Sequence, residues 1–139
     1  MPFSKVSPNL TWEELRCSDT AEYPVRWRTT RAVVLAAEFE AVRELYGEAL
    51  VVNSGYRTPT YNTRIGGAAK SQHVEGRALD LMPLWKDQHT SAAVKRLWAA
   101  AAERASHPSS KLRGLGFYQW GVHMDTRPSA TLVTWDFRR

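Results

Sequence analysis

The sequence of 139 residues contains a single cysteine, Cys17. One thiol cannot form an internal disulfide, and it cannot build a metal cluster held by several thiolates. The sequence also lacks a run of roughly 18 apolar residues, the length that a membrane-spanning helix needs. Its opening, MPFSKVSPNL, has no apolar segment of the kind found in secretory signal peptides. We therefore expect no transmembrane segment and a protein made in the cytoplasm without a signal peptide.

Internal repeats, low-complexity tracts and linkers are likewise missing. Hydrophobic residues make up 43% of the chain and charged residues 24%, which is ordinary globular usage and excludes wholesale disorder. A length of 139 residues suffices for one hydrophobic core. Residues 1–139 are thus predicted to form a single domain, and we expect a monomer.

The net charge of +5 indicates attraction to polyanions, either nucleic acid or an anionic cell wall. The basic residues are scattered along the sequence, and the tight pairs are Arg26/Arg28 and Arg138–Arg139. No motif of alternating aromatic and basic residues supports stacking on bases. We therefore predict no nucleic-acid partner. The alternative, a nucleic-acid-associated protein, would show a DNA affinity that falls steeply with salt.

Periodicity predicts an α+β fold. A capping box over Thr11–Glu14 predicts a short helix at 11–16. Helices are also predicted at 30–46, from an apolar stripe ended by Gly47, and at 91–104. Short apolar runs predict strands at 50–52, 77–82, 114–118, 122–127 and 131–135, and the Gly- and Ser-rich segment 54–72 is expected to be a long loop. This order favours a mainly antiparallel sheet flanked by helices.

Three polar residues have the spacing of a metal site. His73 ends the Gly-rich segment, Asp80 follows seven residues later on a predicted strand, and His123 lies on a late strand. Two imidazoles and one carboxylate, with a fourth position left for water, form the arrangement of a catalytic zinc site. Zinc lowers the pKa of that water to about 7. The alternative is that these histidines are hydrogen-bonded structural residues.

Further motifs surround this set. Ser54-Gly55-Tyr56-Arg57, Asn62, Gly66-Gly67, Ser71-x-His73, Gly76-x-Ala78-x-Asp80 and His123-x-Asp125 follow one another. Together they resemble the M15 family of zinc peptidases, in the branch of zinc D-Ala-D-Ala carboxypeptidases and phage endolysins. The SxHxxGxAxD signature of that branch is present without departure, and residues 10–21 resemble its opening segment. The resemblance covers almost the whole chain and implies the fold of the hedgehog and D-Ala-D-Ala peptidases.

The resemblance implies roles for individual residues. His73, Asp80 and His123 would bind Zn²⁺, and Arg57 would bind substrate, holding a terminal carboxylate bidentately. Ser71 would hydrogen-bond substrate or orient a ligand, or it caps its loop. Gly76 is expected to be small so that the metal can approach, or because it makes a turn.

The general base is harder to assign. Several branches of the family carry Glu or Asp three residues before the last zinc histidine, where this sequence has Trp120. Asp125 lies two residues after His123, so on a strand both side chains share a face, and we predict Asp125 to be the catalytic base. The alternative is an aspartate that pairs with Arg127. Trp85, Tyr118 and Trp120 are expected to line the groove beside the metal or to pack in the core.

These observations lead to a functional hypothesis. We expect a zinc peptidase that hydrolyses peptidoglycan stem peptides or cross-links, as a phage endolysin that reaches the bacterial cell wall by phage-type release. One alternative is a non-catalytic zinc-containing module that binds wall or protein. Another is a dipeptidase that shares the zinc chemistry and differs in the size of its pocket.

Overall fold

The computed structural model describes residues 4–84 and 90–138. Its main sheet has five strands in the order β3-β4-β6-β5-β7. Their bounds are β3 Leu50–Ser54, β4 Ala78–Pro83, β5 Gly114–Phe117, β6 Val122–Asp125 and β7 Val133–Asp136. The α+β prediction is confirmed, although the sheet is mixed because β7 runs parallel to β5. Strand β6 ends at Asp125, beside Gly114 at the start of β5. Strand β7 begins at Val133, also beside Gly114, and therefore runs in the same direction as β5.

Four α-helices are present in the described residues, and their bounds are α1 Trp12–Leu15, α2 Arg31–Tyr46, α3 Pro59–Arg64 and α4 Ser91–Ser106. The capping box of α1 forms as predicted, and Gly47, with a φ of 86°, ends α2. Helix α3 corrects the expectation of a continuous loop over 54–72. Thr58 is the N-cap of this helix, and its side chain accepts a hydrogen bond from the Tyr61 amide. Pro59 occupies the first turn. Smaller elements are η1 Val25–Trp27 and the pair β1 Lys5–Ser7 and β2 Leu10–Thr11.

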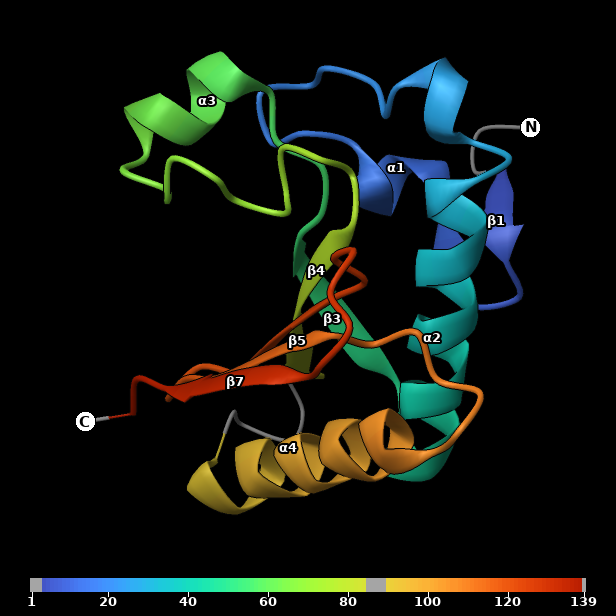
Figure 1. Ribbon diagram of the computed structural model, residues 1–139, viewed down its shortest axis with the longest axis vertical. Coiled ribbons are helices and arrows are strands. Elements are labelled where there is room, and N and C mark those ends of the chain that lie inside the picture. Colours follow the sequence, from blue (N-terminus) through green and yellow to red (C-terminus); the bar gives the residue numbers. More distant parts are fainter. Residues whose placement is uncertain (1–3, 85–89, 139) are drawn as a thin grey trace.

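Helix α4 packs against strands β4, β5 and β6 and crosses α2 (Figure 1). Every second residue of these strands points toward α4 and into the hydrophobic core. The fully buried ones are Leu79 and Leu81 of β4, Leu115 of β5 and Met124 of β6. Alternate residues of the same strands point to the other face. That second face carries Asp80 of β4 and His123 of β6, which lie directly opposite each other. Gly116 of β5 continues the same row on the other side of His123.

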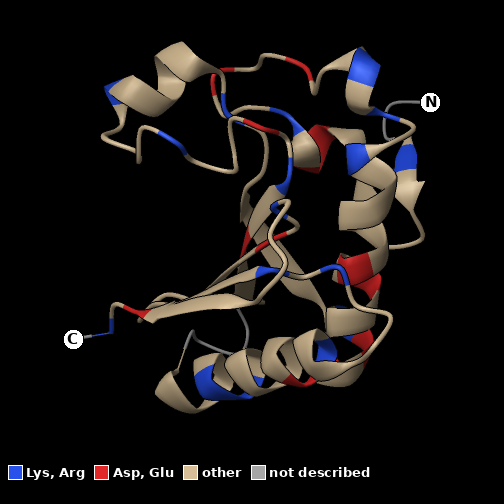
Figure 2. Cartoon of the chain, viewed as in Figure 1, with Lys and Arg blue, Asp and Glu red and all other residues tan. Residues whose placement is uncertain are grey.

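Charge is spread over the surface. Figure 2 shows Lys and Arg on several separate elements, among them α3, α4 and the segment before α2. Among the helices of residues 4–84 and 90–138, none has the length and apolar character needed to cross a membrane.

Glu38 is a buried carboxylate on α2. It accepts hydrogen bonds from Arg104 Nε at 3.0 Å and Nη2 at 2.9 Å, from Ser110 Oγ at 2.7 Å and from the Lys111 amide at 3.2 Å. Burial raises the pKa of the Glu38 carboxyl, but these hydrogen bonds outweigh burial and bring its pKa below the ordinary value. The carboxylate therefore ties α2 to the end of α4 and to the loop that leads to β5.

We expect Glu38→Gln to lower the free energy of unfolding at pH 7 by about 3 kcal/mol, because Arg104 loses its buried counter-charge. A carboxyl with a depressed folded-state pKa stabilises the fold above its unfolded pKa, and this contribution is lost as the pH falls through the folded-state pKa. The difference in free energy of unfolding between wild type and variant should thus shrink as the pH falls below 4.5. Urea unfolding at pH 7 and pH 3 measures this difference.

Glu48→Gln, which breaks the exposed pair with Arg96, is the control, and its free energy of unfolding should differ little from that of the wild type. Equal deficits of Glu38→Gln at both pH values would contradict this expectation.

Candidate metal centre

Three of the predicted residues meet on the face of the sheet opposite α4. Asp80 of β4 lies directly across from His123 of β6, and His73 reaches them from the loop between α3 and β4. One donor atom from each residue can be chosen so that all three lie within 4.8 Å of one another. All three side chains are buried, with His73 2%, Asp80 6% and His123 8% exposed. The structure thus brings together the two imidazole nitrogens and the carboxylate oxygen that the sequence predicts to bind one metal ion.

His73 has one ring nitrogen engaged and the other without a hydrogen bond. Nδ1 lies 2.7 Å from the carbonyl oxygen of Gly55, so it carries the proton and donates it. Nε2 is buried without a hydrogen-bond partner and lies 3.1 Å from Asp80 Oδ1. Burial lowers the pKa of His73 and keeps the ring neutral. A lone pair that faces a carboxylate in a buried site fits a bound cation, and the donor set suits Zn²⁺.

His123 presents its other nitrogen to the same carboxylate. Nδ1 lies 3.0 Å from Asp80 Oδ1, while Nε2 lies 2.7 Å from Asp125 Oδ2. Burial lowers the pKa of His123, but hydrogen bonds with Asp125 and Asp80 outweigh burial and raise it. Donation from Nε2 to Asp125 leaves Nδ1 as the ligand atom. A carboxylate behind a metal-binding histidine fixes the tautomer and the orientation of the ring.

Asp125 is fully buried on β6, and both its oxygens are occupied. Besides His123, it accepts from Arg127 through Nη2 at 2.7 Å, Nε at 2.8 Å and the backbone amide at 3.1 Å. Burial raises the pKa of the Asp125 carboxyl, but Arg127 and His123 outweigh burial and hold its pKa well below the usual range. The side chain shares a strand face with His123, as expected, yet its carboxylate faces His123 and Arg127 and is not among the groups that line the cavity. This geometry favours the alternative of an aspartate paired with Arg127.

A cavity of about 460 Å³ opens in front of the three buried residues. Its lining includes three cationic residues, Arg57, Lys70 and Arg127, and three aromatic residues, Tyr118, Trp120 and Trp135. The Arg127 guanidinium lies 5.4 Å from the centre of the Trp135 ring. Ser71 also lines the cavity. Trp85, considered in the sequence analysis, lies outside the described residues. The cavity lining therefore combines cationic side chains and aromatic rings around the predicted metal site.

Arg57 reaches the cavity with a partly engaged guanidinium. It donates to Ser54 Oγ at 3.2 Å, to Asn62 Oδ1 at 3.3 Å and to Asp80 Oδ2 at 3.4 Å. These bonds are long, and a guanidinium has five N–H donors, so capacity remains for a further anion. Ser71 also lines the cavity, and its hydroxyl accepts from the His73 amide at 3.2 Å. The loop-capping alternative for Ser71 is therefore present in the structure.

Gly76 is required by aromatic packing. Its φ is 68°, and a Cβ at this position would lie 2.7 Å from Cε3 of Trp27 and 2.9 Å from the Tyr23 hydroxyl. That hydroxyl donates to the Gly76 carbonyl at 2.7 Å. The left-handed φ of Gly76 fits the turn that was the alternative expectation, and the close contacts add a packing constraint on the loop that carries His73.

We expect Gly76→Ala to destabilise the fold by about 2–3 kcal/mol, because it adds a buried clash to a left-handed backbone. Displacement of the loop should also weaken zinc binding through His73. Gly66→Ala is the matched control: Gly66 has a φ of 76°, but nothing lies within 4 Å of its added Cβ. Thermal unfolding and zinc titration of both variants measure the two effects. Equal losses in both would show that backbone strain alone is responsible.

Sequence reasoning missed Trp135 as a residue of this site. Trp135 of β7 lies opposite Gly116 of β5, and its ring lies 5.2 Å from that of His123. A Cβ on Gly116 would collide with the Trp135 indole. The available signal was the pair of glycines in Gly114-Leu115-Gly116, which marks a close approach to a strand. The partner of Gly116 could not be identified without knowing that β7 pairs with β5.

The chain is similar in sequence to known proteins. The sequence profile of the family Peptidase M15 matches residues 8–125. A curated relative, the zinc D-Ala-D-Ala carboxypeptidase of Streptomyces albus G, is 32% identical over 114 residues. The match covers 78% of this chain and 41% of the relative, so the chain spans about two fifths of that protein. The relative, the family and the buried His–Asp–His cluster together fit Zn²⁺ as the cofactor. The chain belongs to the M15 family of peptidases.

Proposed function

We propose that this chain is a zinc peptidase that hydrolyses peptide bonds in peptidoglycan stem peptides or cross-links. The observation that carries the proposal is the buried Nε2 of His73, which faces the Asp80 carboxylate without a hydrogen-bond partner. His73, Asp80 and His123 would hold the metal. Zinc, when bound, supplies a Lewis acid that polarises a peptide carbonyl and acidifies water.

The remaining residues bind and orient the substrate. Arg57 would hold a carboxylate of the substrate, with Ser54, Asn62 and Asp80 fixing its guanidinium. Lys70 adds positive charge to the same cavity. Asp125 acts through His123, whose ring it orients, and Arg127 keeps Asp125 ionised. Ser71 supports the backbone of His73.

The family resemblance also supports a biological setting. Its branch includes phage endolysins, so we propose that the protein acts as a monomer on the bacterial cell wall after phage-type release. Light scattering of the purified protein tests the monomer. Lysis of host cells upon expression with a membrane-permeabilising partner, and its loss with the zinc-ligand variants, tests the setting.

Purified peptidoglycan incubated with the protein, with and without a chelator, tests the function directly. Mass spectrometry of the released fragments identifies the bond. Free D-Ala would identify a carboxypeptidase, and monomeric stems from cross-linked dimers an endopeptidase. Both products should disappear with chelator and return with added zinc. No released fragment at any zinc concentration would overturn the proposal.

One observation favours a second candidate, a non-catalytic zinc-containing module that binds wall peptides. Of the described residues that line the cavity, Asp80 is the one carboxylate, and it lies between the two histidines. Among the residues that the structure describes, the lining therefore holds no second carboxylate placed to accept a proton from water. Wall binding that depends on zinc, without cleavage by the wild-type protein, would establish this alternative.

A further inference from the structure

Aromatic side chains form a continuous wall beside the predicted metal site. Tyr118 and Trp120 stack with ring centroids 4.8 Å apart and planes at 19°, and Phe137 meets Tyr118 edge-on at 5.7 Å. Trp135 adjoins them, since its Nε1 donates to the Tyr118 hydroxyl at 2.8 Å. The four rings come from the β5–β6 turn and from β7 and the residue that follows it. We call Tyr118, Trp120, Trp135 and Phe137 the aromatic wall.

The sheet holds this wall in place. The indole of Trp135 lies over Gly116, where a side chain would collide with it, and beside His123. The hydrogen bond from Trp135 then fixes the Tyr118 ring, on which Trp120 stacks. Trp120 is half-buried and is not part of the core cluster. A rigid, partly exposed aromatic surface is a low-entropy contact for a ligand.

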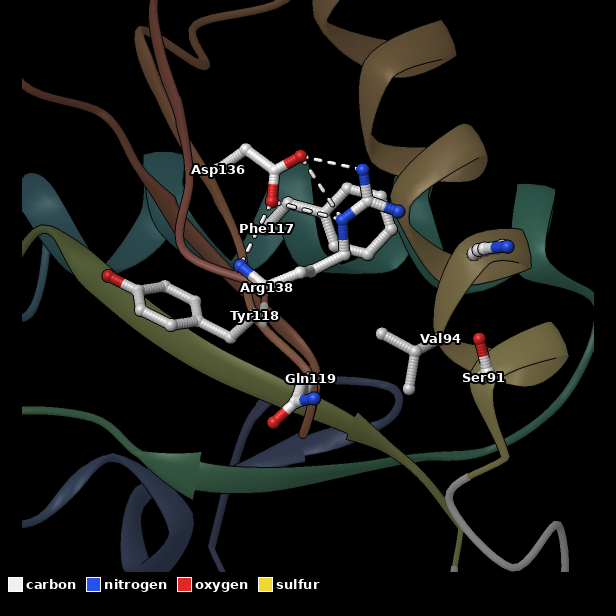
Figure 3. Close-up of a pocket in the computed structure, with 8 residues that line it drawn as sticks. Ser91, Val94, Phe117, Tyr118, Gln119, Asp136 and Arg138 are labelled. Atoms are coloured by element: carbon white, nitrogen blue, oxygen red, sulfur yellow. Dashed lines mark hydrogen bonds and ion pairs between the residues drawn. The ribbon is translucent and has the colours of Figure 1, made fainter.

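The wall extends beyond the metal cavity. A second cavity of about 630 Å³ shares Tyr118 and Trp120 with it and continues to Gln119 and Phe137. Asp136 and Arg138 also line this second cavity, but they pair with each other at 2.6 Å, so the two charges offset one another. Figure 3 shows this ion pair, with Arg138 over Phe117 and the Tyr118 ring directed away from α4. The two cavities therefore adjoin at Tyr118 and Trp120, whereas Arg57 and Lys70 line the metal cavity alone. We call the two adjoining cavities the groove.

A series of contacts sets the direction of a bound peptide. Arg57, the proposed carboxylate-binding residue, donates to Asp80, which faces His123. The Trp135 ring lies beside His123 and donates to Tyr118, so the metal ligands lie between Arg57 and the aromatic wall. The part of the substrate that precedes the scissile bond must then pass over the stacked rings. We propose that Tyr118 and Trp120 form an acyl-side subsite that binds the residues before the scissile bond. This inference rests on the proposed function and makes a stem peptide, rather than a free dipeptide, the preferred ligand.

Binding of two probes to the zinc-loaded protein tests the subsite. The probes are the stem tetrapeptide L-Ala-γ-D-Glu-L-Lys-D-Ala, which is the acyl product of either cleavage, and the dipeptide D-Ala-D-Ala. Calorimetry should show tighter binding of the tetrapeptide. Trp120→Ala should weaken tetrapeptide binding about tenfold and dipeptide binding much less, because the dipeptide has a single residue before its scissile bond. Trp120→Phe, which keeps a stacked ring, should retain most of the affinity.

Two further variants complete the test. Phe137→Ala removes a 65% exposed ring at the far end of the groove and should cause a smaller loss of tetrapeptide affinity. Leu45→Ala removes an apolar side chain on α2 that is 45% exposed, and it should have no effect. Equal affinity of wild type and Trp120→Ala for the tetrapeptide, or no preference of the wild type for the tetrapeptide, would overturn the inference. Tetrapeptide binding lost in Trp120→Ala, without any wall cleavage by the wild type, would keep the subsite and reject the peptidase.

Discussion

Replacing His73 by alanine is expected to abolish stoichiometric zinc binding and to lower peptidoglycan cleavage about 10³-fold or more. The Nε2 atom of His73 is the buried donor that faces Asp80 without a hydrogen bond, so its removal leaves two of the three predicted ligands. Loss of several kcal/mol of transition-state stabilisation corresponds to that change in rate. Metal analysis of the dialysed protein and a peptidoglycan release assay measure the two effects.

The chain offers a matched histidine for this experiment. His107 is exposed at the end of α4, where Nδ1 interacts with Ser109, and His107→Ala should bind zinc and cleave as the wild type does. Circular dichroism of His73→Ala checks that the fold survives loss of the contact with the Gly55 carbonyl. Full wall-cleaving activity of a folded His73→Ala protein would reject both the ligand assignment and the zinc mechanism.

Replacing Asp125 by asparagine is expected to weaken zinc binding about 10- to 100-fold and to lower activity in proportion at limiting zinc. Asparagine keeps the shape of the side chain but removes the charge that both His123 Nε2 and Arg127 contact. One of its two terminal groups must also present N–H donors to a neighbour that is itself a donor. The His123 ring then loses its fixed orientation. Zinc titration followed by activity at saturating zinc separates binding from chemistry.

The same variant distinguishes the two roles considered for Asp125. If Asp125 orients His123, excess zinc should restore most of the activity of Asp125→Asn. If it is the general base, zinc affinity should stay unchanged while activity falls at every zinc concentration. Asp136→Asn is the matched control for zinc affinity, since Asp136 forms the same pairing with an arginine two residues later, but at an exposed position.

The prediction of local elements succeeded where the signal is local. The stripe that predicts a helix at 30–46 matches α2 at Arg31–Tyr46, because periodic burial and the Gly47 stop lie within the helix itself. The missed helix α3 also has local signals, a Thr58 cap and Pro59, but it is short and lies in a segment rich in Gly and Ser. The parallel pairing of β7 has no local signal, because it depends on where the chain returns after β6.

The sequence by itself determined the types of donor and their order. The spacing of His73 and Asp80, with His123 on a late strand, left an N, O, N site and structural histidines both open, and the surrounding motifs then favoured the metal site through the family resemblance. Only the tertiary structure decided which atom of each residue is available. His73 presents Nε2 because Gly55 binds Nδ1, and His123 presents Nδ1 because Asp125 binds Nε2.

The same distinction applies to the single cysteine and the aromatic residues. With one thiol, a metal site cannot be held by several thiolates, which the sequence alone establishes. The aromatic wall depends on strand order, since Trp135 reaches His123 only by lying over Gly116 of the neighbouring strand. Contacts between residues far apart in the chain are set by strand pairing and packing, so a pattern of residues close together in the sequence cannot predict them.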